Sequence, residues 1–330
     1  MRVGILGAGN IAEKMALTLR LMKQRGDDVA LYAVAARDQA RAEAFAARFG
    51  FEKAYGSYEE MLCDDSVQLV YVATPHSHHA EHMKLCISHG KNVLCEKAFT
   101  ANAKQAKEVI ALAREKGVLV AEAIWPRYMP SRKMVDDIIA SGEIGEVKMV
   151  TSNLSYTISH KERIAKPELA GGALLDVGVY ALNFALSVLG SEGIKAIDGT
   201  AVLTDLGVDA QESFSLTYDD GRMASMMSGI YARTDRRGMV YGTKGFIEVD
   251  NVNNPAMISV YKQEKDFADP AVYQVPEQLT GFEYEVEACI RAMENGWLEC
   301  PEMPHEETIR MMEIMDKLRE KFGVHYPFED

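Results

Sequence analysis

The stretch GILGAGNIAEKMA, residues 4–16, decides the fold of the N-terminal part of this 330-residue chain. It places Gly7, Gly9 and Ala12 in a G-x-G-x-x-A pattern, after a short apolar run and at the start of a helical one. In this pattern the first glycine permits a tight turn, the second lets the backbone approach a pyrophosphate, and the small third residue allows close helix–strand packing. The stretch therefore predicts a strand, a loop and a helix that bind a dinucleotide; a purely structural turn is the alternative.

Strand-like and helical patterns alternate from this loop to about residue 123, and glycines such as Gly50, Gly90 and Gly117 follow the helical runs. The strand-like runs are RVGILG, DVALYAVAA, VQLVYVAT, NVLCEK and VLVAEA. Such alternation is typical of an α/β fold with a doubly wound parallel sheet. We therefore predict a dinucleotide-binding Rossmann domain over residues 1–123.

Beyond Trp125 the pattern changes to longer strand-like runs with helices set apart from them. YDDGR and YGTKGF are typical of hairpin turns, and helices are expected over about residues 282–294 and 305–322. We expect residues 124–330 to form an α+β domain for substrate binding and dimerisation, with a large, mostly antiparallel open sheet. One face of an open sheet needs a cover, and a homodimer is the predicted one.

Composition limits the partners of the chain. Forty-nine acidic against 36 basic residues give a net charge of −13, which argues against a nucleic-acid surface. No window approaches the roughly 18 apolar residues that a membrane span requires. The five cysteines are widely spaced and include no CxxC pair, which fits a reducing compartment. These features predict a cytoplasmic protein whose partners include neither nucleic acid nor a membrane.

The end of the second strand bears on the choice of cofactor. LYAVAARD ends in Arg37 and Asp38, with Arg41 one helical turn beyond. An acid at this place accepts bonds from the ribose hydroxyls, whereas an arginine meets a 2′-phosphate. Arg37 therefore favours NADP(H). If Arg37 is merely solvated beside a helix-capping Asp38, NAD(H) remains open.

Two further stretches, VATPHSHHAEHM (residues 72–83) and VLCEKAFT (residues 93–100), complete the pattern. With them the whole chain resembles the Gfo/Idh/MocA family of nicotinamide-dependent oxidoreductases, and within it the dihydrodiol and sugar dehydrogenases. The first stretch is similar to a family loop beside the nicotinamide, and the second to a family acid-Lys-Pro motif. Together with the phosphate loop and Arg37, the resemblance implies these cofactor-binding residues: Gly7, Ala8, Gly9, Asn10, Ile11, Arg37, Thr74, Pro75, His76, His79, Glu96 and Lys97.

GGALLDVGVYALN, residues 171–183, is similar to a family helix in which Asp176 is retained while Tyr180 and Asn183 replace a common His and Asp. In the branch that has tyrosine here, the matching lysine and tyrosine are the proposed catalytic pair, and the cofactor is NADP. Hydride transfer from an alcohol requires an acid–base group at the carbinol oxygen. A nearby ammonium favours ionisation of a phenol, whose reference pKa is about 10.

We therefore expect three catalytic residues. Tyr180 acts as the acid–base, Lys97 holds the reacting oxygen and tunes Tyr180, and Asp176 orients a substrate hydroxyl or Lys97. Exchange of roles, with Lys97 as the proton donor, is the alternative. Ala98 stands where the family has proline, and because a cis bond before a non-proline residue costs about 2.5–4 kcal/mol, we expect a trans Lys97–Ala98 bond or else visible strain.

The histidine-rich stretch could suggest a metal, because His78 and His82 have i,i+4 spacing. No HExxH-type acid accompanies them, so we expect no metal. Loop contacts are expected for His76 and His79, and exposed helix positions for the other histidines.

Recognition of the substrate is expected to involve residues near the domain junction and Asn183. They are Trp125, Arg127, Tyr156 and Asn183. For the first three, packing at the junction is an equal alternative. The predicted substrate is a small polyhydroxylated molecule such as an aldose, a sugar ketone or a cyclic diol. A cofactor-binding sensor without turnover and an NAD-dependent glycosidase are the alternative functions that the resemblance implies.

Overall fold

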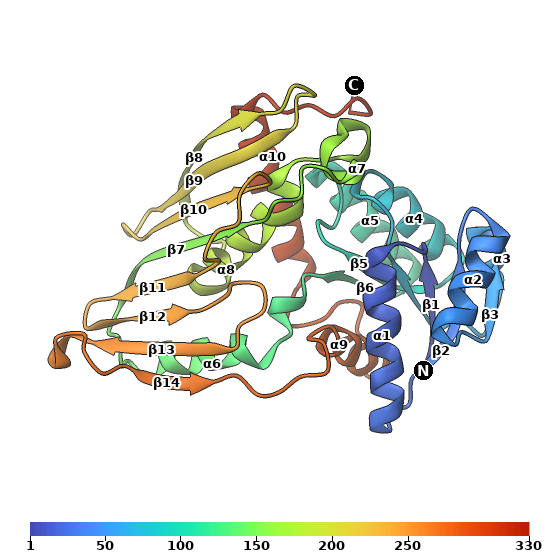
Figure 1. Cartoon of the computed structure of the whole chain (residues 1–330), viewed down its shortest axis with the longest axis horizontal. Helices are drawn as coiled ribbons and strands as arrows, with labels where there is room; N and C mark the ends of the chain where they lie inside the picture. The colour runs from blue at the N-terminus through green and yellow to red at the C-terminus, as the bar shows by residue number, and fades with distance from the viewer. Residues whose placement is uncertain (330) are drawn as a thin grey trace. The chain divides into compact units, whose positions relative to one another are not determined.

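The computed structural model describes residues 1–329, which form two compact units (Figure 1). The first unit comprises Met1–Trp125 and Gln278–Ile309, and the second comprises Pro126–Glu277 and the chain from Arg310 onward. Residues 278–309, which the sequence pattern groups with the second half, thus return to the first unit. The assignment of cofactor binding to residues 1–123, and of substrate binding and dimerisation to residues 124–330, stays a prediction.

A central sheet with helices on it makes up the first unit. Its elements are β1 (Arg2–Leu6), α1 (Asn10–Arg25), β2 (Ala30–Ala35), α2 (Gln39–Phe49), β3 (Lys53–Tyr55), α3 (Tyr58–Leu62), β4 (Leu69–Val72), α4 (His76–Ser88), β5 (Asn92–Glu96), α5 (Ala103–Lys116), β6 (Val120–Ala123) and α9 (Glu283–Glu294). The six strands lie in the order β3-β2-β1-β4-β5-β6, and all neighbours are parallel. This order and direction confirm the predicted doubly wound sheet.

Local sequence signals account for helix starts in this unit. The side chains of Ser57 and Asn102 accept hydrogen bonds from the backbone N–H groups of Glu60 and Gln105, and so cap α3 and α5. Such caps satisfy backbone donors that a helix start leaves without a partner. The stretch SYEEML, residues 57–62, thus carries its own helix start, and α3 follows directly from Ser57.

The returning segment hydrogen-bonds to the edge strand β6. The N–H of Val120 donates to the carbonyl of Leu298 at 3.1 Å, and Nε2 of the buried His305 lies 2.9 Å from the carbonyl oxygen of Val120. Thr308 donates to Glu122 at 2.9 Å. Because an edge strand otherwise exposes unpaired backbone groups, this segment completes the first unit.

An eight-stranded sheet dominates the second unit. Its elements are α6 (Pro130–Ala140), β7 (Val147–Ser155), α7 (Glu162–Ala165), η2 (Pro167–Leu169), η3 (Leu174–Gly178), α8 (Val179–Leu189), β8 (Ile194–Leu203), β9 (Asp209–Tyr218), β10 (Met223–Gly229), β11 (Gly238–Gly242), β12 (Gly245–Val249), β13 (Met257–Lys262), η4 (Gln263–Lys265), β14 (Ala271–Gln274) and most of α10 (His305–Phe322). The strand order is β14-β13-β12-β11-β7-β10-β9-β8, and only β7 and β10 pair in parallel. The predicted open, mostly antiparallel sheet and both predicted hairpins are confirmed.

The two faces of this sheet differ sharply in exposure. Figure 1 shows α8 lying against the middle strands, where it packs on β7, β10 and β11. The row facing it is buried and consists of Leu216, Ala224, Val150, Val240, Ile247 and Val260. The adjacent row, whose side chains point to the other face, consists of Thr217, Met223, Met149, Tyr241, Phe246 and Tyr261. In that row Met223 and Met149 are 45% and 43% exposed.

One helical segment, Pro167–Leu189, is long and apolar enough to cross a membrane. Our expectation that no window approaches this limit is therefore wrong. Of its most apolar window, 89% is buried inside the protein. The segment owes its composition to packing under the eight-stranded sheet, as the core helix of a globular unit does.

Candidate active site

The phosphate loop has the geometry that its glycines predict. Gly7 has φ of +109°, and a Cβ there would lie 3.0 Å from the carbonyl oxygen of Ala73. Only glycine adopts this φ without strain. Gly9 is the N-cap of α1, with no side-chain cap and with open space where a Cβ would stand. The first amides of α1 are thus accessible to an anion, and Ala12 is fully buried at the turn behind them.

Two arginines lie at the carboxyl end of β2. Arg37 is exposed, and its charge acts on Tyr58 and on His82. Arg41 donates from Nη2 to the carbonyl of Ala8 in the phosphate loop at 2.8 Å. Asp38 caps α2 by accepting from the N–H of Arg41 at 2.8 Å. Its carboxylate is therefore already engaged in capping, as the alternative reading of this stretch supposed.

His79 connects the loop after β4 with the loop after β5. Its side chain is fully buried, with Nε2 2.8 Å from the carbonyl oxygen of Thr74 and Nδ1 2.9 Å from that of Ala98. Burial lowers the pKa of His79 to about 4, although both carbonyls oppose this shift. A neutral ring carries one N–H, so only one of the two carbonyls can accept a hydrogen bond from His79 at a time.

His82 differs from its expected position. It is buried rather than exposed, with Nδ1 2.9 Å from Oγ1 of Thr74 and its ring edge-on to Tyr58. Burial also lowers the pKa of His82 to about 4. The expectation failed because the helix turns this position toward α3, a neighbour that the local sequence does not reveal. Within residues 1–329, no group of three or more His, Cys, Asp and Glu side chains is arranged to hold a metal ion.

The end of β5 carries the predicted acid and lysine. Glu96 is buried and accepts a hydrogen bond from the phenol of Tyr71. Lys97 is half-buried at the strand end. The Lys97–Ala98 bond is cis, so the expected trans bond is wrong. Around it, the carbonyl of Ala98 contacts His79 and the N–H of Phe99 donates to Glu122 at 3.2 Å, and these buried contacts fix the chain where proline is missing.

The second unit holds the other two predicted catalytic residues on one continuous segment. Asp176 lies in η3, a π-helical turn, and its side chain is 5% exposed. It pairs with Arg163 of α7, which accounts for its charge inside the unit. Tyr180 lies in the first turn of α8 and is 8% exposed. Single-turn π-helices are frequent at functional sites.

The residues predicted to recognise substrate fall in different surroundings. Trp125 belongs to the first unit and stacks on Phe282, with ring centroids 4.6 Å apart. In the second unit Arg127 donates from Nε to Oδ1 of Asn183 at 2.5 Å, and Tyr156 is half-buried after β7. The structure thus brings Arg127 and Asn183 together and gives Trp125 a packing contact.

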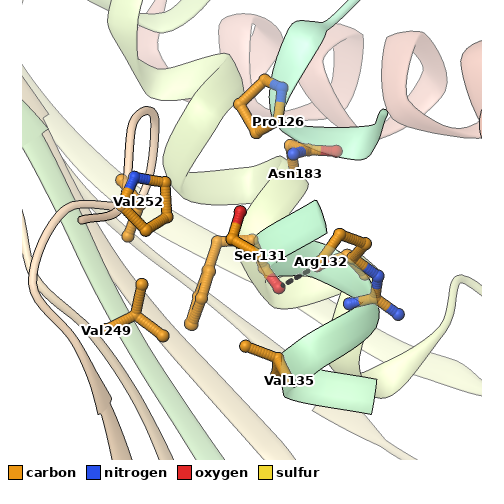
Figure 2. Close-up of a pocket in the computed structure, with 10 residues that line it drawn as sticks. Pro126, Ser131, Arg132, Val135, Asn183, Val249 and Val252 are labelled. Carbon is orange, nitrogen blue, oxygen red and sulfur yellow. Dashed lines mark hydrogen bonds between the residues drawn. The ribbon is translucent and has the colours of Figure 1, made fainter. Parts of the chain in front are cut away.

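A small cavity of about 30 Å³ lies beside Asn183. Figure 2 shows Asn183 and Pro126 at one end of it, with Val135 and Val249 toward the other. This volume holds about one water molecule, which is too little for a sugar or a diol. The cavity is therefore not a substrate pocket.

Sequence reasoning missed several buried acids and one ion pair. Arg163, the partner of Asp176, lies in a charged stretch with no distinguishing pattern. Glu285 is fully buried on α9, and its spacing of four and seven residues from Cys289 and Ala292 was an available signal. Asp209 and Glu212 are three residues apart on one strand, so the alternation of a regular strand does not bring them to one side.

Comparisons with known proteins agree with this architecture. A Gfo/Idh/MocA profile described as "Oxidoreductase family, NAD-binding Rossmann fold" matches residues 1–124, and the Gfo/Idh/MocA C-terminal domain matches residues 133–248. The chain is 33% identical to trans-1,2-dihydrobenzene-1,2-diol dehydrogenase of Mus musculus over 329 residues, 99% of this chain and 98% of that one. For the Homo sapiens enzyme of the same name the identity is 31% over 333 residues, again 99% and 98%.

A solved structure is similar over the same extent. The 3-ketoreductase of Actinomadura kijaniata, in complex with NADP and TDP-benzene, has a TM-score of 0.86 at 27% identity and covers 98% of each chain.

Proposed function

This chain belongs to the Gfo/Idh/MocA family of oxidoreductases, and from that premise we propose that it transfers hydride between NADP(H) and a carbinol or carbonyl carbon of a sugar, polyol or cyclic diol. It is an NAD(P)-binding oxidoreductase that acts on hydroxyl or carbonyl groups. The observation that carries the proposal is the open phosphate loop at the start of α1, where Gly7 and Gly9 leave backbone amides accessible to a pyrophosphate. When bound there, the nicotinamide supplies the hydride chemistry.

The preference for NADP(H) is proposed from the charges after β2. Arg37 and Arg41 present two guanidinium groups at this strand end, whereas Asp38 is engaged at the start of α2. The two guanidinium groups suit the 2′-phosphate of NADP(H). The ribose hydroxyls of NAD(H) would instead need the carboxylate of Asp38. The matched family profile and the ketoreductase support a nicotinamide cofactor in general.

The test is a fluorescence titration of NADPH against NADH. A lost hydrogen bond to a charged group costs about 1.5–3 kcal/mol, so Arg37→Ala should weaken NADPH binding by about tenfold to a hundredfold while NADH binding stays within about threefold. Arg20→Ala, at an exposed position of α1 beyond its first turns, is the matched control and should change neither. Equal binding of both cofactors by the wild type would refute the NADP preference.

Proton transfer is assigned to Tyr180, Lys97 and Asp176. We propose that Tyr180 exchanges the proton of the carbinol oxygen, because hydride transfer to or from this carbon requires one acid–base group in hydrogen-bond reach. Lys97 would hold the same oxygen and favour the phenolate form. Asp176, neutralised by Arg163, would orient a substrate hydroxyl. Glu96, Thr74, Pro75, His76 and His79 would bind and shape the nicotinamide side.

Lys97→Met and Tyr180→Phe should each abolish turnover while NADPH affinity stays within a few fold. Tyr231→Phe, at an exposed position, is the control and should retain activity. Near-normal turnover by Lys97→Met would refute the assignment. If only Tyr180→Phe retains turnover, Lys97 is the proton donor in place of Tyr180. NADPH binding without turnover of any sugar or diol by the wild type would instead indicate a sensor.

A homodimer through the exposed sheet face is also proposed. Met149, Met223 and Met227 are 43–48% exposed on it, and the rings of Phe246 and Tyr261 stack at 4.5 Å beside them. A second copy of this face would bury these side chains by two-fold symmetry. Sedimentation at micromolar concentration should show a dimer, and a strictly monomeric profile would contradict it.

A cytoplasmic location is proposed on the state of the thiols. All five cysteines are free and four of them are buried, and the net charge of −13 argues against a nucleic-acid partner. Fractionation of the producing cells would locate the protein, and recovery outside the cytoplasm would refute this assignment.

A further inference from the structure

A pair of buried carboxyl groups lies under the segment that carries Asp176. Asp209 is fully buried and Glu212 is 4% exposed, both on β9. The pairing of β8 with β9 shifts register here: Val202 is opposite Gln211, but Leu203 is opposite Asp209. This β-bulge adds one residue, Ala210, to β9. It lets two side chains three positions apart point to the same side of the strand.

Each carboxyl group uses one oxygen atom for a hydrogen bond to the surrounding structure. Oδ2 of Asp209 accepts from the N–H of Leu174, the first residue of η3, at 2.5 Å. Oε1 of Glu212 accepts from the hydroxyl of Ser228 on β10. Both contacts lie inside the second unit, so the pair joins the start of η3 to two strands of the sheet.

The remaining oxygen atoms point to a shared proton. Oδ1 of Asp209 and Oε2 of Glu212 are buried and have no hydrogen-bond donor among residues 1–329. The β-bulge turns both side chains to the same side of β9, and each carboxyl group shifts the pKa of the other through a hydrogen bond. Two carboxylates are acceptors only, so they cannot satisfy one another, whereas one proton between them satisfies both oxygens. Burial raises the pKa of each group, which favours retention of that proton.

Two glycines fit the π-helical turn onto this pair. A Cβ on Gly172 would lie 2.1 Å from Oδ1 of Asp209, and a Cβ on Gly178 would lie 2.4 Å from Oε1 of Glu212. η3 itself packs on β7 and β10. The backbone on either side of Asp176 therefore rests directly on the two carboxyl groups, and Tyr180 follows two residues after Gly178.

We propose that Asp209 and Glu212 share one proton and together act as positioning residues, which hold the π-helical turn so that Asp176 and Tyr180 keep their orientation. The role in catalysis rests on the proposed function; the shared proton and the anchoring of the turn do not. Neither carboxyl is proposed to touch substrate or cofactor.

The other charged groups around the pair are already engaged. Tyr326 interacts electrostatically with both carboxyls, and its hydroxyl donates to the carbonyl of Gly171 at 2.9 Å. Arg319 lies over the Tyr326 ring at 4.6 Å and is bonded to Asp316 and Glu329. On η3, Asp176 is paired with Arg163. Loss of the shared proton at alkaline pH would leave two like charges in contact and loosen the turn.

The conservative variant Glu212→Gln separates the two parts of the proposal. Its carbonyl can accept from Ser228 while its amide donates to Asp209, so the bonds persist with no proton to lose. A wild-type-minus-Glu212→Gln infrared difference spectrum at pH about 8 should show the band of one protonated carboxyl group. If the difference spectrum contains no such band, the shared proton is refuted, whatever the activity of the enzyme.

Anchoring is tested by hydrogen exchange of the peptide that contains residues 172–180. Glu212→Ala leaves Asp209 without its proton partner, and exchange of this peptide should accelerate at least about tenfold, whereas Glu212→Gln should stay within about threefold of the wild type. If Glu212→Ala does not fold, Glu212→Met, which fills more of the site, takes its place. Unchanged exchange in the folded variant would refute the anchoring.

The effect of the carboxyl pair on catalysis is measured by steady-state kinetics of the Glu212 variants. In Glu212→Ala, kcat should fall at least about tenfold and NADPH affinity should stay within about threefold, while Glu212→Gln restores kcat at neutral pH. Equal loss of kcat in both variants would refute the positioning role. If the wild type turns over no sugar or diol, the proposed function fails, and the infrared and exchange results still decide the pair.

Discussion

Replacement of Glu285 by glutamine should change how the stability of the first unit depends on pH. Glu285 is fully buried on α9, and neither carboxyl oxygen has a hydrogen-bond partner among residues 1–329. Burial, and then the nearby charge of Glu96, raise the pKa of Glu285 well above its ordinary value. In the unfolded chain it ionises near its reference pKa of about 4.3. Between these two values the folded state therefore holds one more proton than the unfolded state.

The sign and size of the effect follow from this difference. The contribution of Glu285 to the free energy of unfolding falls by about 1.4 kcal/mol for each pH unit above about 4.3, until the pH reaches the raised folded-state pKa. In Glu285→Gln the side chain does not ionise, so this contribution to the pH dependence of the unfolding free energy is absent. Relative to the wild type, the variant should therefore gain about 1.4 kcal/mol for each pH unit between about pH 4.3 and the raised folded-state pKa.

Urea unfolding followed by tryptophan fluorescence measures this difference, because the only two tryptophans, Trp125 and Trp297, both lie in the first unit. Glu294→Gln, at an exposed position of the same helix, is the matched control and should keep the wild-type pH dependence. Parallel pH profiles of wild type and Glu285→Gln would show that Glu285 is ionised in the folded protein, and would refute the argument.

Three substitutions test other parts of the structure. Gly7→Ala forces a side chain into φ of +109° and within 3.0 Å of the Ala73 carbonyl, so the unfolding free energy should fall by at least about 1–2 kcal/mol; an unchanged urea midpoint would contradict this geometry. A Cβ on Gly9 would meet no protein atom within 4 Å, so Gly9→Ala should fold while NADPH affinity falls at least about tenfold; retained affinity would place the pyrophosphate elsewhere. Met223→Glu should give monomers in sedimentation while Leu17→Glu on α1 leaves the dimer intact, and dimers in both would refute the sheet-face interface.

Features that depend on a few neighbouring residues could be predicted from the sequence. The phosphate loop, the helices α9 and α10 and the hairpins at YDDGR and YGTKGF follow from glycine conformation and from apolar periodicity. The parallel sheet follows from strand–helix alternation. The Lys97, Asp176 and Tyr180 assignments rest on resemblance, and they stay predictions because each depends on chemistry that the fold alone does not test.

Features that depend on distant partners could not be predicted. His82 is buried because Tyr58 of α3 lies against it, and Glu285 is buried because the returning segment packs into the first unit. The cis bond before Ala98 is surrounded by contacts from His79 and Glu122, both far along the chain. Of these three features, only Glu285 has a local signal in the sequence, which is its helical spacing from Cys289 and Ala292.

The return of residues 278–309 to the first unit has a consequence for synthesis of the protein. On the ribosome, residues 1–125 emerge with β6 as an open sheet edge, because the partners of its backbone at Leu298 and His305 are still untranslated. Residues 126–277 must be made in between, and their own unit still lacks the chain from Arg310 onward. A nascent chain halted before residue 278 should therefore bind chaperones through this edge, and one extended past residue 309 should be released from them.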